Sequence, residues 1–266
     1  MSDEIDGATG HGVLAGKAGV VTGGAAGLGR AIVLAACAEG AAVVAFDRDA
    51  ELGRATVAEA VSAGGQAVFQ EGDVTREGDV VAAIQRSQRE FGAFNMLDNN
   101  AGIALEKRLH DTSAAEWDSI MEVNLKGAFY GCKHGVIAMR AAGGGSIVNT
   151  GSIVSLVGDP NLPAYATTKT GLVGLTRVVA VDYAEDGIRC NIICPGDMLT
   201  PMVQRTFDLA DDPAAARRAM EAAYPVKRIA DPAEVARAVV FLLSDASSFM
   251  TGAQLVVDGG LTVKCY

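Results

Sequence analysis

The sequence is poor in aromatic residues and in histidine, and it contains no long apolar run. Aromatic residues make up 5% of the 266 residues, and only three residues are histidines, so the core must be built from aliphatic side chains packed around glycine. No run reaches the ~18 apolar residues of a membrane-spanning helix. The first twelve residues are acidic and polar, unlike a signal peptide. We therefore expect a cytoplasmic protein with no membrane partner.

Basic residues and paired cysteines are also scarce. The 22 Lys and Arg residues stand against 32 Asp and Glu, and no basic run is present, which argues against a nucleic-acid partner. The five cysteines are odd in number and scattered. Cys190 and Cys194 lie in an apolar run with no histidine nearby, so we expect reduced core residues and no metal site.

Short apolar runs alternate with helical patterns along the whole chain. Strands are expected within residues 18–23, 41–47, 66–74, 94–102, 145–152, 188–196 and 253–260. Helices are expected at 28–38, 50–62, 163–184 and 232–243. A further helix should end near Phe91, and one long helix should carry Trp117, Val123 and Phe129. Apolar strands alternating with helices predict an α/β fold, a doubly wound, Rossmann-like parallel sheet with helices on both faces. No repeat or linker divides it, so residues 1–266 are expected to form a single domain.

The segment 197–230 interrupts this alternation. It is polar and rich in alanine, and Pro213 and Pro225 predict one or two helices within it. An excursion of this length between a strand and the next regular helix is typical of a substrate lid or a binding loop. The alternative is a surface elaboration that contacts no ligand.

A glycine-rich turn links the first strand to the first helix. In "VVTGGAAGLGRAI" the glycines Gly23, Gly27 and Gly29 follow G-x3-G-x-G spacing, with Gly24 in addition. Residues without Cβ allow a sharp turn and let a pyrophosphate approach the positive end of the helix. The turn therefore predicts a dinucleotide site.

Two carboxylates follow the next strands. Asp47 is placed to bind the adenosine ribose hydroxyls and to repel a 2′-phosphate, which favours NAD over NADP, although Arg48 beside it could soften that preference. Asp73 is placed to meet the adenine. The alternative for each carboxylate is an ordinary turn residue in solvent.

Tyr165 and Lys169 lie one helical turn apart in "PAYATTKTG" and should share one helix face. A free tyrosine, with a pKa of about 10, is a poor base at neutral pH. A neighbouring cation should lower that pKa. By itself such a pair can arise by chance.

Together these elements resemble the short-chain dehydrogenase/reductase family over nearly the whole chain. The family's motifs correspond here to T-G-x3-G-x-G at Thr22 to Gly29, N-N-A-G at Asn99 to Gly102, a helix asparagine at Asn124, a serine after the fifth strand at Ser152, Y-x3-K at Tyr165 and Lys169, and P-G at Pro195 and Gly196. One position departs from the pattern. The family usually has a branched apolar residue before N-N-A-G, and this chain has Asp98.

The resemblance implies a catalytic set. Tyr165 would be the general acid/base, Lys169 would lower its pKa and hold the nicotinamide ribose, and Ser152 would bind the substrate oxygen. Asn124 would support a proton path through water to Lys169, or it could be a helix-kink residue satisfied by backbone. The residues implied to bind the cofactor are Gly23, Gly27, Leu28, Gly29, Asp47, Asp73, Val74, Asn100, Ala101, Gly102, Tyr165, Lys169, Pro195, Gly196 and Thr200.

The expected substrate pocket is apolar. Its candidate walls are Val154, Leu156, Leu162, Met198 and Met202, and no arginine cluster is present to hold a charged group. We therefore expect an uncharged or weakly polar secondary alcohol or its ketone, with cyclic ones among the candidates. The alternatives are a 3-oxoacyl thioester reductase, which Asp47 and Ala26 disfavour, a sugar or polyol dehydrogenase, and a nucleotide-binding protein without catalysis. The resemblance also implies a homotetramer, joined through the Trp117 helix, the helix after Tyr165 and the last strand.

Overall fold

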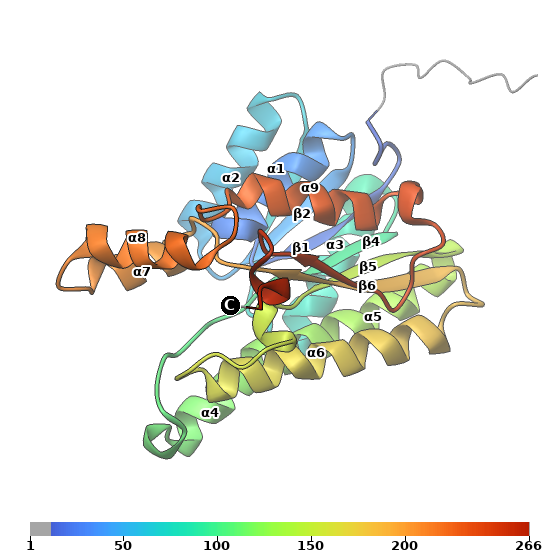
Figure 1. The fold of residues 1–266 in the computed structure, drawn as a ribbon. Helices are drawn as coiled ribbons and strands as arrows, with labels where there is room; N and C mark the ends of the chain where they lie inside the picture. Colours follow the sequence, from blue (N-terminus) through green and yellow to red (C-terminus); the bar gives the residue numbers. More distant parts are fainter. Residues whose placement is uncertain (1–11, 266) are drawn as a thin grey trace, which may run out of the picture.

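Seven parallel strands form the sheet at the centre of the molecule (Figure 1). The structure is a computed structural model that describes residues 12–265, so the prediction for the acidic N-terminus falls almost wholly outside it. The strands are β1 (Ala18–Thr22), β2 (Ala42–Asp47), β3 (Gln66–Glu71), β4 (Met96–Asn99), β5 (Gly145–Thr150), β6 (Ile188–Pro195) and β7 (Gln254–Val257). Their order is β3-β2-β1-β4-β5-β6-β7, which confirms the predicted doubly wound sheet. The order reverses between β1 and β4, where ligands bind in such sheets.

Helices cover both faces of this sheet (Figure 1). Helices α1 (Gly27–Ala38), α2 (Ala50–Ser62) and α9 (Pro232–Leu243) lie on one face, and α3 (Glu77–Phe91), α5 (Gly127–Ala142) and α6 (Pro163–Asp182) lie on the other. Each face has its own aliphatic core, with Val21, Ile32 and Val239 in one and Val20, Ile84 and Ile147 in the other. The strands are buried on both faces because helices pack on each side.

The long helix predicted around Trp117 is not regular. It consists of α4 (Ala114–Met121), a π-helical turn at Glu122–Lys126, and α5. Ser113 and Glu116 form a capping box that begins α4. A π turn inserts a residue into the helical repeat and is found frequently at functional sites. Asn124 lies within this turn.

The excursion 197–230 holds two helices, α7 (Pro201–Asp208) and α8 (Pro213–Ala223). Each begins at a proline that follows a capping side chain, Thr200 or Asp212. The helices extend from the body of the molecule on one side (Figure 1). Both ends of the excursion meet at one place, because the Leu199 N–H donates to the Ala230 carbonyl at 3.0 Å and the Ala230 N–H donates to the Asp197 carbonyl at 3.1 Å.

Residues 12–265 contain no helix that is long and apolar enough to cross a membrane. The five cysteines are free, and Cys190 and Cys194 are buried in the core as expected. In the same range no group of three His, Cys, Asp or Glu side chains is arranged to hold a metal ion.

Candidate active site

A cavity of about 390 Å³ opens at the carboxyl ends of the strands. It extends from the glycine turn after β1 to α7 and α8. Most of the sequence-predicted site residues line it together: Gly23, Gly27, Leu28, Asp47, Asn100, Ala101, Gly102, Ser152, Val154, Leu162, Tyr165, Lys169, Pro195, Gly196, Met198, Thr200 and Met202. Segments far apart in sequence therefore meet at one site, of a size usual for small-ligand pockets.

The glycine turn is tightly packed against its neighbours. Gly23 has φ +67°, and a Cβ there would lie 2.9 Å from the Ala101 Cα. Gly29 does not line the cavity. A Cβ on it would lie 2.0 Å from the Gly23 carbonyl oxygen, so this glycine lets α1 pack against the turn. Helix α1 begins after Ala26, which has no side chain able to cap it, so its first N–H groups are available to an anion.

Hydrogen bonds between side chains and backbone groups hold the end of β1 to the N-N-A-G segment. The Thr22 hydroxyl accepts from the Asn100 and Ala101 N–H groups at 3.0 Å each, and the Asn100 amide donates to the Thr22 carbonyl at 3.0 Å. On the other side, Asp47 accepts from the Ala25 N–H at 3.1 Å. The turn is thus held in shape by residues that also line the cavity.

A second cavity of about 170 Å³ adjoins the first at Gly23, Asp47, Ala101 and Gly102. It is lined further by Phe46, Arg48, Gly72, Asp73, Val74, Ile103 and Val123. The Asp73 carboxylate accepts from the Thr75 N–H and hydroxyl. Although burial opposes them, these bonds and the charges of Arg76 and Arg48 hold the pKa of Asp73 below its usual value. Asp73 therefore shapes its own turn and still lines the cavity.

Helix α6 carries Tyr165 and Lys169 to the cavity wall. Pro163 occupies the first helical position, so both residues lie in the first two turns. The Lys169 ammonium lies 5.5 Å from the centre of the Tyr165 ring. It donates to the Thr150 carbonyl at 2.7 Å, and the lysine is 3% exposed. The shared face expected from the i, i+4 spacing is present.

Burial is the largest influence on the pKa values of this pair. Burial raises the pKa of Tyr165 to about 12, with the Ser152 hydroxyl opposing and Asp197 adding to the rise. Burial lowers the pKa of Lys169 to about 8, with Cys194 and Asp98 opposing. The lysine thus loses its charge before the tyrosine titrates. At neutral pH Lys169 still carries its charge, and its lowering of the Tyr165 pKa stays a prediction.

Ser152 follows β5 at the start of a short 3-10 turn, Ile153–Ser155. Its hydroxyl accepts from the Val154 N–H at 3.3 Å, and its N–H donates to the Ser155 hydroxyl at 3.2 Å. Ser155 in turn donates to the Lys169 carbonyl at 2.9 Å. The serine is therefore fixed to α6, and its hydroxyl is near enough to lower the pKa of Tyr165.

Asn124 lies outside both cavities. Its amide oxygen accepts from the Ile103 N–H at 2.8 Å, and its amide nitrogen donates to the Ile103 carbonyl at 2.9 Å and to the Thr168 hydroxyl at 3.3 Å. The side chain thus clamps the segment after N-N-A-G to the residue beside Lys169. Backbone groups thus satisfy the Asn124 amide, as in the alternative role considered for it. These groups belong to Ile103 and not to the helix that carries Asn124.

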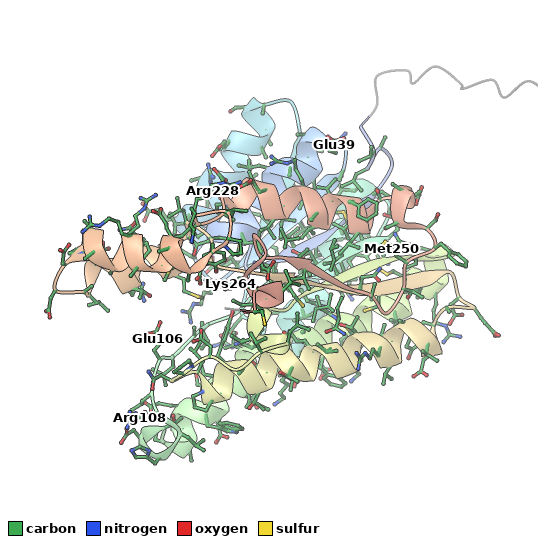
Figure 2. The ribbon with its side chains drawn as sticks, viewed as in Figure 1. Glu39, Glu106, Arg108, Arg228, Met250 and Lys264 are labelled. Atoms are coloured by element: carbon green, nitrogen blue, oxygen red, sulfur yellow. The ribbon has the colours of Figure 1, made fainter. Side chains whose placement is uncertain are left out.

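Sequence reasoning missed three carboxylates that line the main cavity, Glu106, Asp159 and Asp197. Glu106 lies on the segment leading to α4, on the side of the molecule from which α7 and α8 extend (Figure 2). Asp197 accepts from the Tyr224 hydroxyl at 2.8 Å. Burial raises the pKa of Asp197, and Asp159 acts in the same direction. The only signal in the sequence was the position of Asp197 directly after P-G.

One expected pocket wall was wrong. Leu156, which directly follows the 3-10 turn, is 42% exposed and does not line the cavity. The excursion contributes Val203, Thr206 and Met220 besides the two expected methionines. Thr150 and Gly151, at the end of β5, also line the cavity and were not expected.

Comparison with known proteins covers nearly the whole chain. Residues 23–262 match the family model described as enoyl-(acyl carrier protein) reductase. A cyclohexanol dehydrogenase from Acinetobacter sp. (strain SE19) is 38% identical over 93% of this chain and 96% of its own length. A cis-4-hydroxycyclohexanecarboxylate dehydrogenase from Sinomonas cyclohexanicum is 44% identical over 92% and 96%. A crystal structure from Burkholderia xenovorans, described as a short-chain dehydrogenase/reductase, superposes with a TM-score of 0.92 at 35% identity, covering 96% of this chain and 100% of that one.

Proposed function

The chain belongs to the short-chain dehydrogenase/reductase family, and on that premise we propose that it interconverts a secondary alcohol and its ketone with NAD(H). Membership of this family implies a nicotinamide cofactor. The observation that carries the proposal is that Ser152, Tyr165 and Lys169 line one cavity together with the glycine turn. An acid/base group and a dinucleotide cradle are thus available to the same bound molecule.

The residues present fit a dinucleotide. The turn at Gly23 has no room for a Cβ, and the uncapped start of α1 suits a pyrophosphate. When bound, the nicotinamide ring would accept hydride from the alcohol carbon or return it to the ketone carbon. Asp47 lines both cavities, and a carboxylate there would repel a 2′-phosphate, which supports NAD over NADP. Thr200 packs against Gly27 and would meet the nicotinamide end.

Tyr165 would act as the general acid/base. In oxidation it would take the proton of the substrate hydroxyl, and in reduction it would return one to the ketone oxygen. With a pKa of about 12, the phenol is almost wholly protonated near neutral pH, so too little phenolate is present to act as the base. Lys169 can lower that pKa only while it is an ammonium itself, so its charge is central to the proposal.

Ser152 would donate a hydrogen bond to the substrate oxygen and stabilise the charge that develops there. Removing a preorganised donor of this kind costs roughly 100- to 1000-fold in rate. Asn124 would act indirectly, because its clamp on Ile103 holds the N-N-A-G segment in place beside Lys169. A proton path through water from Asn124 to Lys169 stays a prediction of the family resemblance.

We propose an uncharged, cyclic secondary alcohol as the substrate. The walls are apolar at Val154, Leu162, Met198 and Met202, and Lys169 is the only basic side chain among the described residues that line the main cavity. Besides Asp47, the carboxylates of Glu106, Asp159 and Asp197 line the same cavity, so an anionic substrate would meet repulsion without a counter-charge. The phosphopantetheine arm of an acyl thioester would meet the same obstacle. The α7–α8 excursion would be the lid over this pocket, since Met198, Met202 and Met220 come from it.

The test is NADH formation with cyclohexanol, cyclopentanol, linear secondary alcohols, a polyol and cis-4-hydroxycyclohexanecarboxylate. Turnover should be highest with the neutral cyclic alcohols and should need NAD. Tyr165→Phe should lower kcat by at least about 1000-fold while NADH binding, followed by fluorescence, changes little. Full turnover in that variant, or no dinucleotide binding by the wild type, would overturn the assignment.

We also propose a homotetramer in the cytoplasm. The single chain exposes Phe129 and Ile137 on α5 and Val178 and Val181 on α6, and Phe249 is fully exposed near β7. These are the elements that the sequence suggested as interfaces, and apolar side chains at such places favour burial between subunits. Light scattering coupled to size exclusion measures the assembly directly.

A further inference from the structure

Asp98 is a carboxyl group at the centre of the sheet. It is 0% exposed and pairs in register with Val21 of β1 and Val148 of β5, so aliphatic residues flank it on both sides. Strand β4 lies in the middle of the sheet (Figure 1). Burying a charge in such surroundings is costly unless another charge or a set of donors compensates it. The function of this carboxyl is not accounted for by the catalytic set.

Within residues 12–265 no side chain or backbone group hydrogen-bonds either carboxyl oxygen of Asp98, and the Thr150 hydroxyl is also without a partner. Thr150 follows Val148 by two residues, so its side chain lies on the same sheet face as that of Asp98. The Thr150 carbonyl accepts the hydrogen bond from the Lys169 ammonium at 2.7 Å. A threonine hydroxyl can rotate toward a neighbour. Thr150 therefore lies beside both residues: its carbonyl binds Lys169, and its hydroxyl, without a partner in the described part of the chain, is on the sheet face that carries Asp98.

The charges around Lys169 come from few groups. Cys194 of β6 and Asp98 of β4 both raise its pKa against the effect of burial. Burial also raises the pKa of the Cys194 thiol, which keeps it neutral at physiological pH. Tyr165, on the same helix, stays neutral because its pKa is about 12, and Asp197 acts on that tyrosine. Asp98 is thus the carboxyl that acts on the lysine within the described chain.

We propose that Asp98 is a positioning residue of the reaction: its buried carboxylate, on the sheet face beside Thr150, keeps Lys169 in the ammonium form up to a higher pH than burial alone would allow and so lets the lysine act on Tyr165. The effect on catalysis rests on the proposed dehydrogenase function. The electrostatic coupling of Asp98 to Lys169 is independent of that function.

The direction of the effect follows from the two groups together. Burial raises the pKa of Asp98 to about 8, with Lys169 and Thr150 opposing, and burial lowers that of Lys169 to about the same value. Two such groups titrate as a pair. As Asp98 loses its proton it opposes the loss of the lysine proton. Without this carboxylate, Lys169 becomes neutral at a lower pH. Above that pH the lysine can no longer lower the pKa of Tyr165.

The first test is the pH profile of kcat/KM for alcohol oxidation in Asp98→Asn and Asp98→Val. Ser146→Ala is the matched control, because Ser146 is a buried neutral residue of β5 paired with Met96, whose hydroxyl bonds the Leu242 carbonyl. The alkaline limb should move to lower pH by one unit or more in both Asp98 variants and should stay in place in the control. A limb that stays in place in folded Asp98 variants overturns the proposal.

The second test needs no turnover. A double-mutant cycle of Asp98→Asn and Lys169→Met, read by urea unfolding without cofactor, should show coupling at pH 8, where the Asp98 carboxylate and the Lys169 ammonium coexist, and little at pH 6, where Asp98 is neutral. Coupling that is absent at pH 8, or equal at both pH values, overturns the link between the residues. If the cycle shows the coupling but the wild type oxidises no alcohol, the proposed function has failed and the electrostatic pair remains. If Asp98→Asn does not fold, the apolar substitution Asp98→Val replaces it in the cycle.

Discussion

Replacing Lys169 with methionine should make the protein more stable at neutral pH while it loses activity. The lysine is 3% exposed, and burial lowers its pKa from 10.5 to about 8. Below pH 8 Lys169 is therefore charged in the folded chain. That charge is less well solvated there than in the unfolded chain, so it lowers the free energy of unfolding. Methionine has a similar length, fills the same space and carries no charge.

The magnitude follows from the difference between the two pKa values, about 2.5 units. At about 1.36 kcal/mol per unit, the buried charge costs on the order of 3 kcal/mol at pH 7. Between pH 8 and 10.5 the unfolded chain carries a proton that the folded chain has lost, so wild-type stability rises with pH in that window. The variant lacks this rise. Loss of the hydrogen bond to the Thr150 carbonyl costs the variant about 1–3 kcal/mol, independent of pH in this range.

The assay is urea unfolding at pH 7, 8, 9 and 10 at one fixed protomer concentration, since assembly would also change the apparent stability. The stability of Lys169→Met relative to wild type should fall by about 2–3 kcal/mol from pH 7 to pH 10. Lys133→Met is the control, because Lys133 is exposed and pairs with Glu77 at the surface. Parallel curves for wild type and Lys169→Met would refute the lowered pKa and the reasoning built on it.

Three further outcomes are expected. Asp47→Ala should raise the NADP-to-NAD ratio of kcat/KM by roughly 10- to 100-fold, because one repulsive charge near the ribose is removed; an unchanged ratio would place the ribose elsewhere. Gly29→Ala should weaken NADH binding by about 10-fold or more, since the new Cβ meets the Gly23 carbonyl oxygen at 2.0 Å, and calorimetry measures the loss. Glu106→Gln with Asp159→Asn should increase use of cis-4-hydroxycyclohexanecarboxylate relative to cyclohexanol about 3- to 10-fold, most clearly at low salt; equal use at all salt concentrations would contradict the repulsion.

Local signals in the sequence were sufficient for the elements of the fold. The strand runs, the prolines that begin α6 and α9, and the glycine turn before α1 each depend on near neighbours in the chain, and all were found close to their expected bounds. The order of the strands follows from that alternation, because parallel strands joined by helices have few ways to form a sheet. The break in the long helix was raised only as an alternative role for Asn124. In the structure Asn124 lies in the break and bonds Ile103, 21 residues earlier in the chain, a contact that local signals do not predict.

The sequence by itself determined which residue types reach the site: a tyrosine and a lysine on one helix face, a serine after β5, and glycines where a dinucleotide must approach the backbone. Only the tertiary structure decided their protonation states and the charge of the pocket. Both depend on how much water is excluded and on which charges lie nearby. Asp98 acts on the pKa of Lys169, and Asp159 on that of Asp197, across segments that the chain order separates. Electrostatic interactions act through space and grow stronger in a dry interior, so only the folded arrangement determines their sign and size.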